Sequence, residues 1–200
     1  MNSAVVLLCS HRKQGRTSKL LQALSNVGNT DIVPFSDVSF QPCIQCAQCS
    51  EGHCTMYRDD GLNDLIDKLK KAGGFIIISP LYAPIPSKLS AFLERLTSIS
   101  YFSQTLRNEP MPLKMKHCSV IGYDSNGRNA GLETLIKSMI RPILTGYDGA
   151  GNSEQYKFVE SGHIPITGND NLDEYCCSIL RNMNLIRSAE NEGRAECNCA

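Results

Sequence analysis

The chain has 200 residues, 20 Lys and Arg against 20 Asp and Glu, and 42% hydrophobic residues. This length predicts a single domain with one substantial core. The neutral charge balance argues against nucleic acid or a membrane surface as the main partner, and the apolar runs are too short to cross a bilayer.

The first part of the chain alternates strand and helix signals. AVVLLC at 4–9 is an apolar run without a positive segment before it, which predicts a buried strand of a cytoplasmic protein and not a secretory signal. Apolar residues recur at helical spacing over 20–27, after Thr17 or Ser18 as helix caps. DIVPF at 31–35 predicts a second strand, which its proline assigns to a sheet edge.

The rest of the chain repeats this alternation. In order, we expect a helix over 62–69, a strand at 75–79, a helix over 89–96, a strand at 118–123, a helix over 132–139 that stops near Pro142, a weaker strand at 154–160 and a last helix over 172–183. Strands alternating with helices indicate a three-layer α/β domain with a five-stranded parallel sheet. We expect this domain to cover residues 1–187 and the tail at 188–200 to be loose.

One connection, residues 37–60, is too long for a simple strand-to-helix link, and we name it the cysteine segment. Its four cysteines are Cys43, Cys46, Cys49 and Cys54. In a chain without an export signal, clustered thiols indicate metal or redox chemistry. The spacing C-x2-C-x2-C-x4-C favours a 4Fe–4S cluster over zinc, whose sites usually split into two separated pairs. A redox dithiol switch and plain free thiols are the other interpretations.

The remaining six cysteines predict no ligand role. Cys9 and Cys118 lie in expected core strands, and Cys176 lies on the apolar face of the last helix with Cys177 beside it. Cys197 and Cys199 are expected to be unstructured thiols of the tail.

Three loops follow strand ends, which is where open α/β sheets bind ligands. The first, SHRKQGRTS at 10–18, combines Arg12 and Arg16 with Gly15 and with hydroxyl groups beside a helix N-terminus. Such groups form a cradle for one phosphate. The plain alternative is a solvated basic turn capped by Thr17.

The other two loops suit a flat ring. SPLYAPIPSKL at 79–89 is stiffened by prolines and offers apolar and aromatic surface. GYDSNGRNAG at 122–131 is rich in Gly, Asn and Ser, so its backbone amides would reach a heteroaromatic rim. Ordinary turn chemistry explains both loops equally simply.

These stretches resemble signatures of a known superfamily. SHRKQGRTSKLL is similar to the S-x-R-x-x-G-x-S/T phosphate loop of the flavodoxin-like NADPH-dependent FMN reductases. SPLYAPIPSKLSAFLERL resembles their second signature, where a P-x-Y segment meets the isoalloxazine ring, and RNAGLETL at 128–135 resembles the third. With the cysteine group added, the resemblance over about residues 4–140 narrows to the iron–sulfur flavoproteins.

The resemblance implies a flavodoxin-like fold with strand order 2-1-3-4-5, bound FMN, and a 4Fe–4S cluster on the four clustered cysteines. The implied FMN-binding residues are Ser10, Arg12, Gly15, Arg16, Thr17, Ser18, Pro80, Leu81, Tyr82, Ala83, Ile85, Tyr123, Asp124, Ser125 and Arg128. No side-chain acid or base stands out as catalytic.

The expected function is electron transfer by a flavin-dependent oxidoreductase, between a one-electron donor and an acceptor, because FMN handles electrons in pairs or singly and the cluster handles one. We expect both cofactors at the carboxyl edge of the sheet. The family resemblance implies a ferredoxin-type or NAD(P)H donor. The rivals are an NAD(P)H-dependent FMN or quinone reductase with a zinc-bound or metal-free cysteine segment, and a non-enzymatic flavodoxin-like carrier or redox sensor.

The last expectation concerns assembly. The cysteine segment offers few apolar anchors besides Met56 and Tyr57, so a cluster on it would be poorly shielded in one chain. Relatives form homodimers or higher assemblies, and we expect a homodimer or homotetramer with Tyr82 and the cysteine segment close to a subunit boundary.

Overall fold

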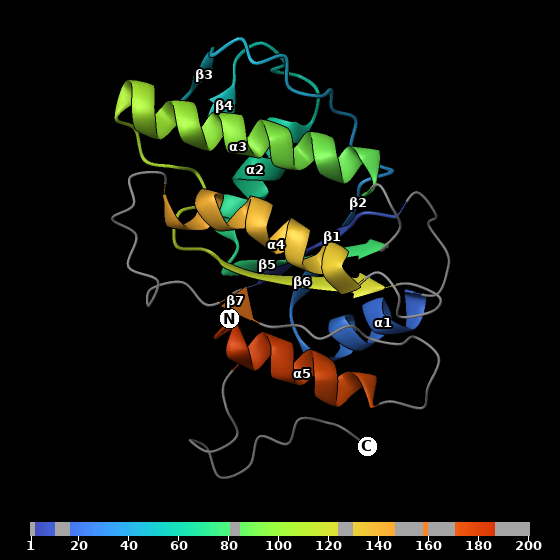
Figure 1. The fold of residues 1–200 in the computed structure, drawn as a ribbon. Coiled ribbons are helices and arrows are strands. Elements are labelled where there is room, and N and C mark those ends of the chain that lie inside the picture. The colour runs from blue at the N-terminus through green and yellow to red at the C-terminus, as the bar shows by residue number, and fades with distance from the viewer. Residues whose placement is uncertain are drawn as a thin grey trace.

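A five-stranded parallel sheet forms the centre of the computed structural model, which describes residues 3–10, 17–80, 85–123, 130–146, 158–159 and 171–186. The strand order is β2-β1-β5-β6-β7, as the sequence predicted, and β2 is an edge (Figure 1). The strands are β1 Ala4–Leu8, β2 Thr30–Pro34, β5 Gly74–Pro80, β6 His117–Tyr123 and β7 Phe158–Val159.

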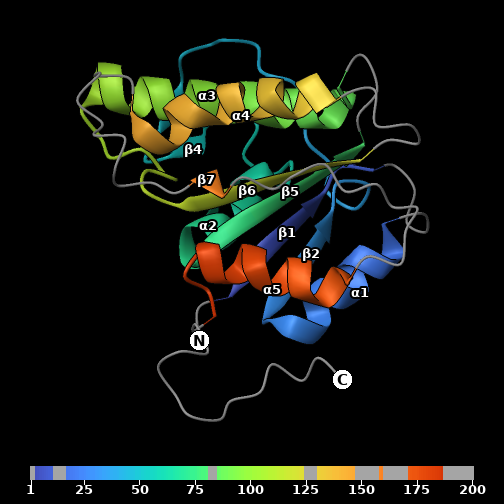
Figure 2. The ribbon, with the colours of Figure 1, turned by 60° about the horizontal axis from the view of Figure 1, so that its bottom comes forward.

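Helices cover both faces of the sheet, which gives the three expected layers (Figures 1 and 2). The helices are α1 Ser18–Val27, α2 Leu62–Lys71, α3 Ser87–Arg107, α4 Ala130–Thr145 and α5 Leu172–Asn182. Side chains alternate between the faces of a strand. Accordingly, Val6 of β1 packs with α1 and α5, whereas Leu7 packs with α2, α3 and α4.

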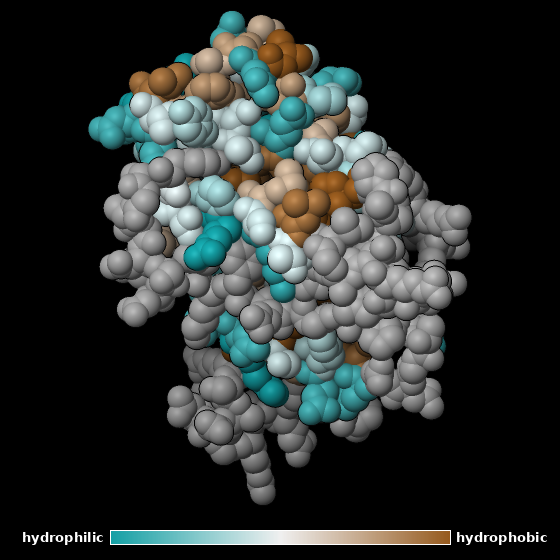
Figure 3. Space-filling view, in the orientation of Figure 1, coloured by the Kyte–Doolittle hydropathy of each residue, from teal (hydrophilic) through white to brown (hydrophobic). Residues whose placement is uncertain are grey.

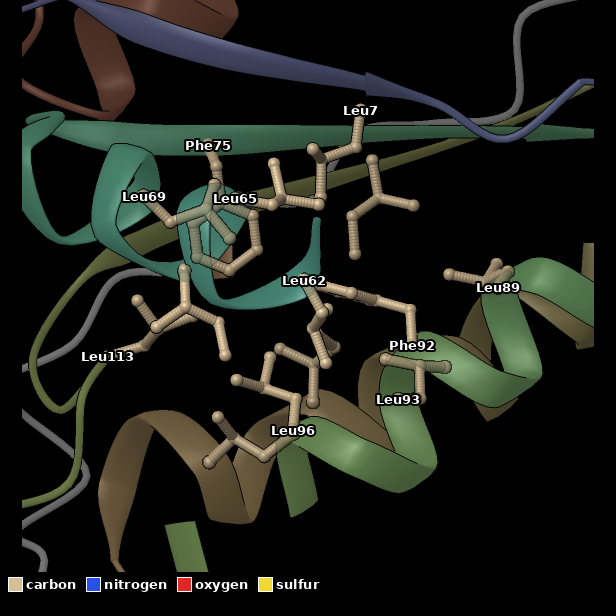
Figure 4. Close-up of a cluster of buried hydrophobic side chains, with 14 of the residues drawn as sticks. Leu7, Leu62, Leu65, Leu69, Phe75, Leu89, Phe92, Leu93, Leu96 and Leu113 are labelled. Atoms are coloured by element: carbon tan, nitrogen blue, oxygen red, sulfur yellow. The ribbon is translucent and has the colours of Figure 1, made fainter. Parts of the chain in front are cut away.

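The larger core lies between the sheet and α3 (Figure 4). Leu62, Leu65 and Leu69 of α2 meet Phe75 of β5 there. Their spacing puts them on one face of α2, and each is buried. Phe92, Leu93 and Leu96 of α3 close the same core from the outside. The rigid unit that results carries the functional segments at its edges.

The end of α4 differs from the prediction. The helix runs through Pro142 and ends at Thr145, although a proline inside a helix removes one backbone hydrogen bond. Ile143 and Leu144 are buried in the core just after it, so their packing keeps the last turn helical. Leu135, which lies within the helix expected over 132–139, is 47% exposed.

The cysteine segment also differs from the prediction, because it has secondary structure of its own. β3 Cys49–Ser50 and β4 His53–Cys54 form a small antiparallel hairpin that is separate from the main sheet. Figure 1 shows this hairpin next to α3, and both of its strands contact that helix. The expected tail at 188–200 lies outside the described residues. Among the described helices, none combines the length and apolar character needed to cross a membrane.

Candidate cofactor sites

The hairpin places the last two predicted ligands side by side. Cys49 and Cys54 are directly paired across the two strands. Glu51 and Gly52 form the turn between them with backbone φ values of 53° and 75°. Two consecutive left-handed residues are typical of a type I′ turn, whose twist matches that of a hairpin. The x4 spacing is thus the spacing of a tight two-residue hairpin.

Cys43 and Cys46 lie on a loop that reverses direction before it reaches Cys49 in β3. Gln45 and Ala47 have left-handed φ values of 53° and 54°, which are uncommon outside glycine and concentrate where a ligand is clamped. The backbone N–H of Gln45 donates to Cys43 Sγ at 3.3 Å. The Cys43 thiol in turn donates to Ser98 Oγ of α3 at 3.3 Å. Hydrogen bonds to a ligand sulfur orient it and tune a metal site.

All four cysteines line one small cavity, which we name the cysteine cavity. The other lining residues are Ile44, Ala47, Met56, Tyr57, Arg95 and Phe102. Within the described part of the chain, no three His, Cys, Asp or Glu side chains are grouped as ligands of a single metal ion. The thiols therefore surround a space and do not converge on one point.

Electrostatics links the four thiols. Burial raises the pKa of Cys49 to about 11, the nearby Cys54, Cys43 and Cys46 raise it as well, and Arg107 lowers it. Four thiolates would repel one another in this half-buried space, and the raised pKa of Cys49 reflects that repulsion together with burial. A cationic metal core would supply the missing positive charge.

Three cations of α3 hold the cysteine segment and the residues before it. Lys88 Nζ donates to the carbonyls of Phe35 and Val38 at 2.6 and 2.8 Å. Farther along, Arg95 Nη1 donates to the Gln41 carbonyl at 3.3 Å, and Arg107 Nη2 donates to the Ala47 carbonyl at 3.1 Å. These contacts occur in the same order along α3 and along the segment that it holds. The chain therefore runs alongside α3, from its first turn to its last.

Polar contacts also fix the hairpin itself. The side-chain amide of Asn63 accepts from the Cys54 N–H at 2.9 Å and donates to the Cys54 carbonyl at 3.0 Å. Glu109 accepts from the Glu51 N–H at 2.7 Å and from Ser50 Oγ at 3.4 Å. His53 Nε2 lies 2.8 Å from the Asp67 carboxylate. Polar groups of α2, α3 and Glu109 therefore hold the segment, in addition to any apolar anchors.

Two buried guanidinium nitrogens test whether an anionic group fits near the cysteines. Arg95 Nη2 and Arg107 Nη1 are both buried and have no hydrogen-bond partner. Buried donors without partners are costly. An iron–sulfur cluster on four thiolates is anionic overall, and its sulfurs accept hydrogen bonds. The donor set and these two unsatisfied cations therefore fit such a cluster.

The described part of the predicted flavin site lies at the carboxyl edge of the sheet. Thr17 is buried at the start of α1, and its side chain makes no capping hydrogen bond. Pro80 and Tyr123 are paired as the last residues of β5 and β6, and Ser10 follows the end of β1. Ser18, in the first turn of α1, is exposed, and Ile85 is partly buried against the larger core.

The other predicted flavin residues lie outside the described residues, and their role stays a prediction. They are Arg12, Gly15, Arg16, Leu81, Tyr82, Ala83, Asp124, Ser125 and Arg128.

The two candidate sites are not at the same edge, contrary to expectation. α3 begins at Ser87, just after the carboxyl end of β5, and its residues Arg95 and Phe102 line the cysteine cavity. At 1.5 Å per helical residue, these positions lie about 12 and 22 Å along the helix from Ser87. Figure 1 shows the cysteine hairpin over the far half of α3, away from the carboxyl ends of the strands.

Sequence reasoning missed the residues that support the cysteines. Arg95 is 1% exposed, and it pairs with Asp60. Its signal was present, because an arginine inside the apolar run of α3 is rarely buried without a partner. The roles of Asn63 and Glu109 had no such signal, since asparagine and glutamate are ordinary surface residues.

The cysteines expected in the core are there. Cys9, Cys118, Cys176 and Cys177 are each no more than 1% exposed. Burial raises the pKa of the Cys176 thiol to about 12, and Asp173 raises it as well. These thiols are unreactive under neutral conditions.

Comparison with known proteins identifies the family of the chain. The model of the NADPH-dependent FMN reductase family matches residues 3–144. The chain belongs to this family. The resemblance of its loops to the flavodoxin-like FMN reductases is thereby confirmed, and the expectation of a flavin-dependent oxidoreductase agrees with it.

Two curated relatives of this family member are named iron–sulfur flavoproteins. One, from Methanocaldococcus jannaschii, is 30% identical over 137 residues, which are 65% of this chain and 65% of that protein. The other, from Methanosarcina thermophila, is 28% identical over 137 residues, which are 65% of this chain and 66% of that protein. The match thus spans slightly less than two thirds of these relatives' length.

Solved structures confirm the flavodoxin-like fold. RosB with a bound 8-demethyl-8-formylriboflavin-5′-phosphate intermediate has a TM-score of 0.57 at 16% identity, covering 92% of this chain and 79% of that one. An apo NADH:FMN oxidoreductase has a TM-score of 0.54 at 16% identity, covering 94% and 92%. An NAD(P)H:quinone oxidoreductase from Methanothermobacter marburgensis has a TM-score of 0.53 at 14% identity, covering 92% and 94%.

Proposed function

We propose that this family member is an electron-transfer flavoprotein with FMN at the carboxyl edge of its sheet and a 4Fe–4S cluster in the cysteine cavity. The observation that carries the proposal is the gathering of Cys43, Cys46, Cys49 and Cys54 around one cavity. The family match and the names of the two curated relatives support the same conclusion. The cofactors would supply two-electron and one-electron chemistry, and the chain would bind, space and tune them.

The chain's own residues are suited to that task. Ile44, Met56 and Phe102 give the cysteine cavity an apolar wall, which limits the access of water and lowers the local dielectric constant. At the other site, the Thr17 hydroxyl at the start of α1 would be a donor to a phosphate, and the helix N-terminus favours its negative charge.

Cofactor content tests the proposal directly. We would purify the full chain without oxygen and measure iron, acid-labile sulfide, zinc and flavin per chain. The expected result is iron and sulfide in equal amounts, near four of each per chain, with one FMN. Zinc without sulfide would support a reductase with a zinc-bound cysteine segment, and flavin alone would support a metal-free segment. Either result would contradict the proposal.

Turnover separates an enzyme from a passive carrier. Cluster-loaded protein would be mixed with NADPH or with reduced ferredoxin, with oxygen or a quinone as the acceptor. Steady consumption of the acceptor with one of these donors is expected. Reduction of bound flavin without turnover would instead indicate a carrier or sensor.

The proposal includes a homo-oligomer in which the cluster of one chain meets the flavin of another. Ile44 and Met56 line the cysteine cavity and are 56% and 44% exposed. Tyr101 and Leu106 on α3 are also exposed. Figure 3 shows hydrophobic side chains at the surface of this end of the molecule. Because α3 separates the two sites within one chain, a neighbouring chain would give a shorter path. Light scattering at micromolar concentration should show at least a dimer, and a monomer would contradict it.

A further inference from the structure

Arg95 is an unusual neighbour for four cysteines. It lies in the middle of α3, lines the cysteine cavity and is 1% exposed. Its Nη1 donates to the Asp60 carboxylate and to the Gln41 carbonyl, and its guanidinium lies 5.2 Å from the centre of the Tyr57 ring. Its Nη2 is buried and has no hydrogen-bond partner. Nη1 of the guanidinium therefore has two hydrogen-bond acceptors, whereas Nη2 has none.

Protein stability alone does not explain this arrangement. Burying an ion pair usually gains little over packing apolar side chains of similar volume, because both charges lose their hydration. Leaving one guanidinium nitrogen without a partner adds a further penalty. Asp60 is 14% exposed, so its negative charge is better screened by water than the positive charge of Arg95. The cysteine cavity therefore experiences a net positive contribution from the pair.

We propose that Arg95 is a positioning residue that sets the reduction potential of the iron–sulfur cluster, and that Asp60 moderates its effect. This inference rests on the proposed function. A cluster on four thiolates is anionic, and reduction adds one more negative charge. A positive charge beside it stabilises the reduced form more than the oxidised form, which raises the reduction potential.

The side-chain type supports this role. The planar fork of arginine can bond Asp60 and Gln41 with one nitrogen, lie against Tyr57 with its face and still present a second nitrogen to a sulfur. Arginine also stays protonated when buried, so its charge is fixed across the working pH range.

Two substitutions that break the same ion pair give opposite expectations. Arg95→Gln removes the positive charge and should make the cluster potential more negative. Asp60→Asn removes the negative charge and should make it more positive. A purely structural role predicts no shifts of opposite sign, because both variants lose the Arg95–Asp60 pair. Asp60 also accepts from the N–H groups of Gln41 and Leu62, and the side-chain oxygen of Asn can still accept a hydrogen bond there. Arg95→Lys keeps the charge and should stay closer to the wild type than Arg95→Gln.

A second ion pair provides the matched control. Lys68 and Asp31 are 2.8 Å apart on α2 and β2, and neither lines the cysteine cavity. Lys68→Gln and Asp31→Asn make the same charge changes without a cavity contact. Both should leave the cluster potential near that of the wild type.

The experiment is a redox titration of full-length, cluster-loaded protein, read by electron paramagnetic resonance and absorbance, with iron and sulfide measured for each variant. Opposite shifts in Arg95→Gln and Asp60→Asn support the inference. Full clusters with unchanged potentials, or with shifts of one sign, overturn it and leave the proposed function intact. If Arg95→Gln does not retain its cluster, the rise in Asp60→Asn decides. Wild-type protein without iron and sulfide overturns both.

Discussion

Cys49 and Cys54 face each other across an antiparallel hairpin, with a two-residue turn between the strands. Directly paired residues in such a hairpin have their Cβ atoms about 4.5–5.5 Å apart. A ligand pair at this separation is fixed by backbone hydrogen bonding before any metal arrives. The third and fourth predicted ligands are thus positioned by secondary structure, whereas Cys43 and Cys46 depend on a curled loop.

The hairpin turn gives the first prediction. Gly52 has a φ of 75°, and a Cβ there would lie 3.3 Å from Pro112 Cβ, so Gly52→Ala should destabilise the folded chain by about 1–2 kcal/mol. Glu51→Asn creates the preferred Asn-Gly turn. It should stabilise the folded chain by between a few tenths of a kcal/mol and about 1 kcal/mol. Urea unfolding of the metal-free chain measures both changes. Equal stability of the two variants would contradict the assigned turn.

The second prediction separates ligands from core cysteines. Cys54→Ser should lose most of the iron and keep the flavin, because its side chain lines the cysteine cavity and not the carboxyl edge. Cys176→Ser should keep both cofactors and should lower the free energy of unfolding, since it buries a hydroxyl in the core, by about 1–3 kcal/mol. Iron and flavin analysis alongside urea unfolding checks the pair. Full iron in Cys54→Ser would exclude it as a ligand.

Asn63 is the subject of the third prediction. Asn63→Asp keeps an acceptor for the Cys54 N–H but removes the donor to the Cys54 carbonyl. The lost bond and the added charge should lower the free energy of unfolding by about 1–3 kcal/mol and speed iron loss to a chelator. Asn29→Asp, at an exposed loop residue, is the control. Equal chelation rates in the two variants would show that Asn63 does not hold the hairpin.

The fourth prediction concerns the flavin. Arg12→Ala should weaken FMN binding by about 1.5–3 kcal/mol, because a charged hydrogen bond to the phosphate is lost. Lys19→Ala removes an exposed positive charge from the first turn of α1 and should change binding much less. Fluorescence titration of the flavin-free chain measures both affinities. An unchanged affinity in Arg12→Ala would show that the phosphate binds elsewhere.

A mixed oligomer tests the path between chains. Cys46→Ser, which should lack the cluster, and Arg12→Ala, stripped of its more weakly bound flavin by dialysis, would be co-expressed with different tags and purified through both. If electrons pass between chains, the mixed oligomer should regain roughly half of the wild-type rate of flavin reduction by the cluster. Each variant alone should show none. No recovery in a verified mixed oligomer would place the path within one chain.

The sequence predicted the sheet, because buried strands and one-sided helices leave strong periodic signals in stretches such as AVVLLC at 4–9. It also identified the four thiols of the cysteine cavity, since their spacing is compact. It did not predict where they lie. That position depends on Lys88, Arg95 and Arg107 binding carbonyls far away in sequence, and no local pattern encodes such contacts. Pro142 failed as a stop signal for the same reason, because distant core packing outweighed a local rule.

The placement of the cysteine hairpin along α3 has one more consequence. Under the proposed function, α3 holds the flavin and the cluster of the same polypeptide apart, which slows electron transfer between them. In an isolated chain, the two cofactors would exchange electrons slowly. Contact with a neighbouring chain would allow electron transfer between the cluster of one chain and the flavin of the other. Assembly itself would then switch on electron transfer. The number of turns in α3 would determine how slow electron transfer is within a lone chain.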